Sequence, residues 1–192
     1  MGIKNSNAKQ KIKNALISLI INQPYESITI TDIARTAKIN RSTYYYYYYR
    51  KEEILNDIIV QCTHDLIDAI KSPYIRVNEL EINDTVLPST TILFEYVYQH
   101  RIFFKALLNC ELSPAFQEYF IEVLGKYFSQ CLVTDYKITR IEKDISTSFH
   151  AYGILGMIIK WVNDDFSQHP SYIAEQYTYI LDHKMEKIQI NL

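Results

Sequence analysis

Two helix-start signals lie eleven residues apart near the N-terminus, and they restrict this part of the chain to two short helices. Thr29 and Asp32 form a Thr-x-x-Asp capping pattern, with Ile28 and Ile33 spaced to pack against each other across it. Asn40 is a second residue of the type that caps a helix N-terminus. Two short capped helices joined by about three residues form a helix-turn-helix, so we expect that motif here.

The rest of the chain also favours helices. Its 192 residues include only four glycines and five prolines, and no segment of useful length alternates polar and apolar residues as a strand does. Pro88, Pro114 and Pro170 stand where helices can begin. We therefore predict an all-α fold. Helices are expected at 7–22, 29–38, from 40 onward, and at 51–71, 89–108, 113–133, 139–163 and 170–189, with a connector over 72–88.

The charge is distributed unevenly along the chain. Residues 1–51 contain nine Lys or Arg against two acidic residues, a net +7, whereas the remainder contains eleven against twenty, a net −9. A basic head on an acidic body suggests that the head binds a polyanion. A solvated, lysine-rich N-terminus is the alternative that charge alone leaves open.

Motifs for catalysis and for metal or cofactor binding are absent from the sequence. Cys62, Cys110 and Cys131 are too widely spaced for a zinc site or a disulfide framework, and no phosphate loop or nucleophile elbow occurs. The apolar run at 16–21 is too short to span a membrane, and no targeting signal is evident. We expect a cytoplasmic protein that is not an enzyme and uses no cofactor or metal ion.

Six consecutive tyrosines, Tyr44 to Tyr49, continue the second capped helix. On a helix Tyr44 and Tyr48 share one face and can pack inward, while Tyr45 and Tyr46 fall beside Arg41 on the outer side. A phenol on a rigid helix can donate a hydrogen bond to a phosphate oxygen, and its ring can touch sugars and thymine methyls. Surface or core packing without a role in binding is the alternative.

Together these segments carry a resemblance to a known family. Residues 29–34, 37–45 and 51–55, with Tyr48 between them, resemble the DNA-binding domain of the TetR/AcrR family of transcriptional regulators. The resemblance implies an N-terminal three-helix DNA-binding domain at 7–67, whose third helix enters the major groove. It also implies a C-terminal helical ligand-sensing and dimerisation domain at 68–192.

The resemblance also implies which side chains contact DNA. Arg41 would read a guanine edge or bind a phosphate, and Tyr45 and Lys51 would bind phosphates. The sequence departs from the family's usual pattern at Arg50, where a small polar cap is common, and at Ser42, where glycine is frequent. The implied DNA-binding residues are Thr29, Thr31, Arg41, Ser42, Thr43, Tyr45, Tyr46, Tyr47 and Lys51.

In the C-terminal part, Gly153 and Gly156 stand three residues apart within an expected helix and leave room for another helix to approach. We expect this helix and the next to supply half of a four-helix dimer interface, the alternative being that they pack only within one protomer. The expected interface residues are Tyr152, Gly153, Gly156, Trp161, Ile173, Tyr177 and Ile180.

A small-molecule effector would bind among the helices from 51 to 163, although most aromatic residues there are core residues by type. Candidates for lining its site are Tyr96, His100, Phe103, Phe104, Tyr119, Phe120 and Phe149. The expected function is a repressor that binds a palindromic operator in double-stranded DNA as a homodimer and responds to that effector. The alternative is a DNA-binding co-regulator or nucleoid-associated adaptor whose body binds a protein partner instead.

Overall fold

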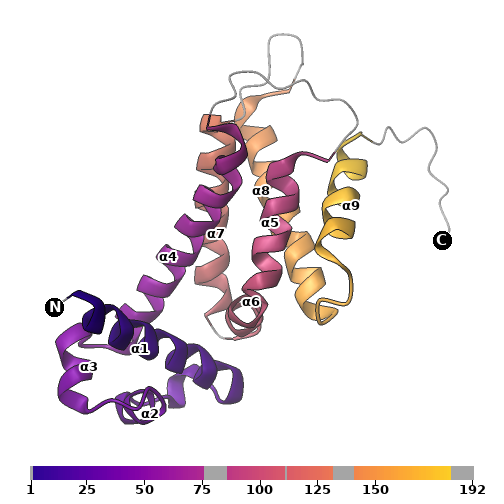
Figure 1. Ribbon diagram of the computed structural model, residues 1–192. Helices are drawn as coiled ribbons and strands as arrows, with labels where there is room; N and C mark the ends of the chain where they lie inside the picture. Colours follow the sequence, from indigo (N-terminus) through magenta and orange to yellow (C-terminus); the bar gives the residue numbers. More distant parts are fainter. Residues whose placement is uncertain (1, 76–85, 111, 132–140, 183–192) are drawn as a thin grey trace.

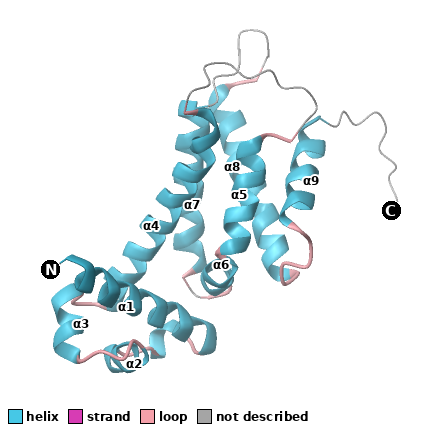
Figure 2. Cartoon of the chain, viewed as in Figure 1, coloured by secondary structure: helices cyan, strands magenta, loops and turns pink. Residues whose placement is uncertain are grey.

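The computed structural model describes residues 2–75, 86–110, 112–131 and 141–182, and all regular structure in these ranges is helical (Figures 1 and 2). The all-α fold predicted from the sequence is therefore confirmed. The α-helices are α1 (Gly2–Asn22), α2 (Ile30–Thr36), α3 (Arg41–Tyr47), α4 (Lys51–Lys71), α5 (Pro88–Gln99), α6 (Arg101–Leu108), α7 (Ser113–Cys131), α8 (Lys143–Asn163) and α9 (Pro170–Asp182). Two short 3₁₀ helices, η1 (Tyr25–Ser27) and η2 (Ser72–Tyr74), precede α2 and follow α4.

Helices α2 and α3 begin at the two residues that the sequence marks as caps. The Thr29 hydroxyl accepts a hydrogen bond from the Asp32 backbone N–H at 3.2 Å, and the Asp32 carboxylate accepts one from the Thr29 N–H at 3.1 Å. The Asn40 side-chain oxygen accepts from the Thr43 N–H at 2.7 Å. These local bonds satisfy N–H groups that a helix N-terminus otherwise leaves without partners.

The turn between α2 and α3 is closed by backbone hydrogen bonds at the end of α2. The Ile39 N–H donates to the Ala34 carbonyl at 3.0 Å, and the Lys38 N–H donates to the Arg35 carbonyl at 3.1 Å. This pair of bonds is the Schellman motif, which requires a left-handed residue directly after the helix cap. Lys38 is that residue, with a φ of 55°.

Helix α4 joins the two parts of the molecule. It begins among α1 to α3 and runs upward to pack with α5 and α7 (Figure 1). Its apolar face is buried along the whole length, from Ile54 near the start to Ile70 near the end. The buried side chains of both parts form one continuous hydrophobic cluster, so neither part has a separate core.

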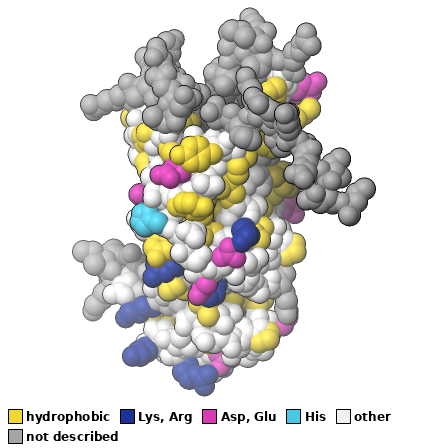
Figure 3. Space-filling view, turned by 90° about the vertical axis from the view of Figure 1, so that its right-hand side faces the viewer, with side chains coloured by type: hydrophobic (Ala, Val, Ile, Leu, Met, Phe, Trp, Pro, Cys, Tyr) yellow, Lys and Arg dark blue, Asp and Glu magenta, His cyan; other side chains and the backbone are white. Residues whose placement is uncertain are grey.

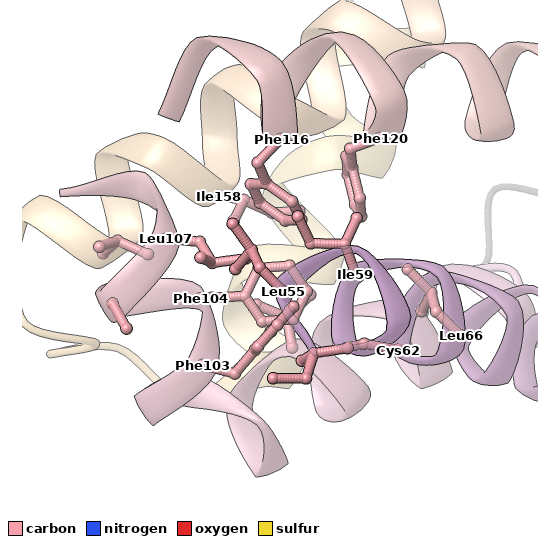
Figure 4. Close-up of a cluster of buried hydrophobic side chains, with 14 of the residues drawn as sticks. Leu55, Ile59, Cys62, Leu66, Phe103, Phe104, Leu107, Phe116, Phe120 and Ile158 are labelled. Atoms are coloured by element: carbon pink, nitrogen blue, oxygen red, sulfur yellow. The ribbon is translucent and has the colours of Figure 1, made fainter. Parts of the chain in front are cut away.

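The body consists of α5, α7, α8 and α9, with the short α6 at the end nearest to α1 (Figure 1). Its centre is rich in aromatic rings. Phe104 of α6 lies 5.9 Å from Phe116 and 6.0 Å from Phe120 of α7, measured between ring centroids. These rings pack on Leu55 and Ile59 of α4 (Figure 4).

The prediction of one helix over 89–108 was wrong, because the structure divides it at His100. His100 is both the C-cap of α5 and the N-cap of α6. Its ring stacks on that of Tyr96, with a centroid distance of 4.1 Å. The bend turns α6 so that Phe103 and Phe104 enter the core. The sequence has no proline or glycine at this break. The break follows from tertiary packing, which is why the sequence did not predict it.

Other helix bounds agree with the sequence more closely. The predicted 51–71 helix matches α4, and Pro88, Pro114 and Pro170 each lie within the first two residues of a helix. The predicted 139–163 helix begins at Lys143, with 139–140 outside the described residues. The ends of the helices predicted at 113–133 and 170–189, and most of the connector at 72–88, also lie outside them. None of the helices in the described ranges combines the length and hydropathy needed to span a bilayer.

The left-handed conformation of Lys38 generates a stability prediction. An L-residue in this region costs about 1–2 kcal/mol because its Cβ crowds the following carbonyl, and glycine avoids that cost. We expect Lys38→Gly to raise the free energy of unfolding by about 1 kcal/mol in urea denaturation. Lys38→Ala keeps the Cβ and serves as the control. Equal stabilities of the glycine and alanine variants would contradict the prediction.

Candidate nucleic-acid interface

The six tyrosines at 44–49 divide into buried and exposed side chains. Tyr44 and Tyr48 are 0% and 4% exposed, whereas Tyr45 and Tyr46 are 41% and 71% exposed. This is the inward and outward division that the sequence predicts. Helix α3 itself ends at Tyr47, so Tyr48 turns inward from an extended backbone rather than from a further helical turn.

The two buried tyrosines differ in their hydroxyl groups. The Tyr48 hydroxyl donates a hydrogen bond of 2.6 Å to the Asp57 carboxylate on α4. The Tyr44 hydroxyl is buried and has no hydrogen-bond partner among the described residues. Burial, with the nearby Glu52 carboxylate, raises the pKa of Tyr44 to about 12, so its phenol stays neutral. Both rings anchor α3 against the core, but only Tyr48 also makes a polar contact.

Asp57 is the centre of a charged network beneath α3. Lys9 and Lys13 of α1 lie 2.8 Å and 3.2 Å from its carboxylate. Burial would raise the pKa of Asp57, but the hydrogen bonds from Lys9, Tyr48 and Lys13 outweigh it and hold the pKa at about 2. The carboxylate is therefore ionised, and it joins α1, α4 and the end of α3.

The outer face of α3 carries the side chains suited to contact a nucleic acid. Arg41, Tyr45 and Tyr46 are exposed, and Tyr47 is half-buried with its ring 4.9 Å from that of Tyr46. Ser42 and Thr43 share this helix, but both hydroxyls donate to the Asn40 side-chain oxygen, at 2.9 Å and 2.5 Å. On α2, Thr29 is exposed but serves as the cap, and Thr31 is exposed.

Lys51, which the sequence led us to expect at a phosphate, instead binds backbone carbonyls of its own chain. Its ammonium donates to the carbonyls of Tyr25, Glu26 and Ile28 at 2.7, 3.2 and 3.1 Å. It also lies 4.3 Å from the centre of the Tyr25 ring. These bonds hold the η1 segment against the start of α4, so the ammonium of Lys51 already has three acceptors.

Arg50, directly before α4, makes no side-chain cap hydrogen bond, as expected for a cationic residue that cannot accept one. Lys and Arg side chains are exposed on the lower part of the face seen in Figure 3, to which α1 and α2 contribute, while apolar side chains are exposed above it on the body. The arrangement suits contact with a polyanion.

Only some of the aromatic residues proposed from the sequence to line a ligand site come together. Tyr96, His100 and Phe103 line a cleft between α1, α4 and the α5–α6 corner. Phe104 and Phe120 are each 1% exposed in the core, which differs from the prediction because their rings pack against each other. Tyr119 is half-buried on α7, and Phe149 is exposed on α8; neither lines the cleft.

The residues expected at a dimer interface also divide into two groups. Trp161 and Tyr177 are buried within the protomer, so they do not face a partner as expected: the Trp161 indole donates to the Gln168 carbonyl and its ring packs on Phe166. The others remain accessible at least in part. These are Tyr152, Gly153 and Gly156 of α8 and Ile173 and Ile180 of α9.

Two capped helices crossing through a tight turn, with an exposed arginine and tyrosine face in a basic head, define a helix-turn-helix DNA-binding protein. Models of protein families agree. Residues 12–58 match the model of bacterial regulatory proteins of the tetR family, and residues 84–183, more than half of the chain, match a transcriptional regulator C-terminal region. The chain belongs to the TetR family of DNA-binding transcriptional regulators.

The individual proteins that this chain resembles share only low sequence identity with it. The chain is 27% identical over 180 residues to YxbF of Bacillus subtilis (strain 168), an uncharacterized HTH-type transcriptional regulator; the match covers 92% of this chain but only 45% of that protein. Its fold resembles a putative TetR-family regulator from Syntrophomonas wolfei str. Goettingen, with a TM-score of 0.74, 18% identity and coverage of 93% and 94% of the two chains. It also resembles a putative fatty acid metabolism regulator from Clostridium perfringens, with a TM-score of 0.67, 22% identity and coverage of 92% and 100%.

Sequence reasoning missed the network around Asp57 and the role of Lys51. One signal was available, because Lys9 and Lys13 are one turn apart on the same face of α1. Nothing in the sequence indicated that Asp57 faces them, since this contact depends on how α1 crosses α4.

The unequal hydroxyls of the two buried tyrosines generate the next prediction. Tyr44→Phe removes an unpaired buried hydroxyl, and we expect it to raise the free energy of unfolding by about 1 kcal/mol. Tyr48→Phe removes a hydrogen bond to a carboxylate and should lower it by about 1.5–3 kcal/mol. Each variant is the control for the other, since both keep the ring. Chemical denaturation measures both values, and shifts of the same sign would contradict the assignment.

Proposed function

We propose that this chain is a repressor that binds a palindromic operator as a homodimer and releases it when a small effector binds. In this proposal residues 7–67 form the DNA-binding domain, residues 68–192 form the effector-binding and dimerisation domain, and the protein acts on DNA in the cytoplasm. The observation that carries the proposal is the exposed Arg41 and tyrosine face of α3, held from behind by the buried Tyr44 and Tyr48.

Each DNA-facing residue has a proposed role that follows from its chemistry. Arg41, at the start of α3, reads a guanine edge or binds a phosphate. Tyr45 and Tyr46 donate hydrogen bonds to phosphates, and their rings reach sugars and thymine methyls. Thr29 and Thr31 approach the backbone from α2, and Tyr47, Ser42 and Thr43 complete the face. Lys51 contributes positive charge near this face, while its hydrogen bonds go to backbone carbonyls.

The proposed dimer forms through α8 and α9. Tyr152 is 62% exposed, and Ile180 and Phe149 are each 58% exposed. A Cβ added at Gly153 or Gly156 would meet no atom within 4 Å, so space is open there for a second helix. A two-fold dimer places two recognition helices about 34–36 Å apart, in successive major grooves of a palindromic operator. Bound there, a repressor excludes other proteins from the same DNA.

The DNA-binding face is tested by removing one phenol. Operator sequences are first selected from a random DNA pool, which should return a palindrome. We expect Tyr45→Phe to weaken binding to the selected operator, and to unrelated DNA, by about tenfold, because a hydrogen bond to a charged phosphate is lost while the ring remains. Fluorescence anisotropy measures both affinities. Tyr98→Phe, on the body, should bind as wild type does. Recovery of no enriched sequence, or wild-type affinity of Tyr45→Phe, would refute this assignment.

The dimer is tested at an exposed position on α8. We expect the wild-type protein to sediment as a dimer at micromolar concentration and Tyr152→Arg to sediment as a monomer, because each interface would bury an arginine that has no charge partner. Val60→Arg places the same charge at an exposed site on α4 and should remain dimeric. A monomeric wild type would contradict the proposed dimer, and a dimeric Tyr152→Arg would contradict the placement of its interface at Tyr152.

A further inference from the structure

A cleft of about 600 Å³ lies at the junction of the DNA-binding head and the body, lined by α1 on one side and by α4 and the α5–α6 corner on the other. Its size lies within the range of small-molecule sites in proteins, which is about 300–1,000 Å³. Because its walls come from both parts of the molecule, a molecule held there touches the head and the body at once.

One corner of the cleft presents hydrogen-bond donors. Lys13 of α1 is only 6% exposed, and its ammonium lies 2.5 Å from the Gln61 side-chain oxygen and 3.2 Å from the Asp57 carboxylate. An ammonium has three N–H donors, so one remains without an acceptor among the described residues. The amide nitrogens of Gln61 and Asn14 are further donors, because the Asn14 oxygen already accepts from Gln10. A carboxylate in this corner would accept from all three groups.

The other walls of the cleft are largely apolar. Ile17 of α1 and Ile102 and Phe103 of α6 line it, and Ile102 is 58% exposed. Asp65 also lines the cleft, one helical turn beyond Gln61 on α4. Its negative charge disfavours an anion at that end, so a carboxylate is stabilised only beside Lys13.

We propose that this cleft binds a small amphipathic carboxylate, with its head group on Lys13, Asn14 and Gln61 and its apolar body on Ile17, Ile102 and Phe103. The site is thus at the junction of head and body, and among the aromatic residues suggested by the sequence only Tyr96, His100 and Phe103 line it. The proposal names the location and chemical class of the effector in the function proposed above and rests on that function for its regulatory role.

The contacts of Lys13 connect this cleft to the recognition helix. Lys13 binds Asp57, and Asp57 accepts the hydrogen bond from Tyr48 at the C-terminal cap of α3. A carboxylate that draws the Lys13 ammonium toward the cleft weakens its contact with Asp57 and thereby changes how the end of α3 is held. Such a ligand shifts DNA affinity only if it binds one position of the head more tightly than the other.

Calorimetric titration of the DNA-free full chain with octanoate tests the site directly. We expect octanoate to bind wild type and octanamide, which lacks the charge, to bind at least tenfold more weakly. Ile102→Trp places a larger ring where the octanoate chain would lie on the apolar wall of the cleft and should weaken octanoate binding at least tenfold. Val60→Trp adds the same ring at an exposed site that does not line the cleft, and it should bind as wild type does. Lys13→Met removes the ammonium and should reduce the preference for octanoate over octanamide.

No octanoate binding by wild type at millimolar concentration would overturn the proposal. Equal binding by Ile102→Trp, or tighter binding of octylamine than of octanoate, would do the same. Saturating octanoate should also lower the operator affinity of wild type several-fold and leave that of Ile102→Trp unchanged; an unchanged wild-type affinity would overturn the coupling. A failure of the proposed regulator function would be seen in a separate experiment. In that case the ligand-free protein would select no sequence from the random DNA pool.

Discussion

The continuous apolar face of α4 is the constraint on which the rest of the structure depends. Its first turns complete the core beneath α3, and its later turns pack against α5 and α7. Burial of apolar surface is the main favourable term in folding, so the single cluster that includes both parts ties the stability of the head to that of the body. In the proposed function, a displacement of α4 in the body would therefore also move the residues of the head that pack on its first turns.

The tyrosine run shows how the position of a residue in a helix, or directly after it, determines its role. Tyr44 and Tyr48 have identical side chains and are both buried, yet one hydroxyl is unpaired and the other binds a carboxylate. Tyr45 and Tyr46, their neighbours in sequence, are exposed and carry the proposed contacts to DNA. A single residue type thus supplies both the anchor of the recognition helix and its outer surface.

The polar contacts around α1 connect elements that are far apart in the sequence. Lys13 and Gln61 are 48 residues apart, and Lys51 and Tyr25 are 26 residues apart. A buried ammonium is stable only when acceptors surround it, so these contacts fix the angle at which α1 and η1 meet α4. Of these residues, Lys13 and Gln61 also line the cleft between head and body, which is why the proposed ligand would act on the orientation of the head.

The sequence by itself determined the features that depend on neighbours within one helical turn. The capping pattern at Thr29 and Asp32, the cap at Asn40 and the first-turn prolines marked where helices begin, and helical spacing placed Tyr44 inside. Only the tertiary structure decided the break at His100, the burial of Trp161, the carbonyl contacts of Lys51 and the existence of the cleft. Caps and periodicity arise from contacts three or four residues apart, which a sequence displays. The other features arise from the angles at which helices cross, and those angles are set by the packing of side chains that are distant along the chain.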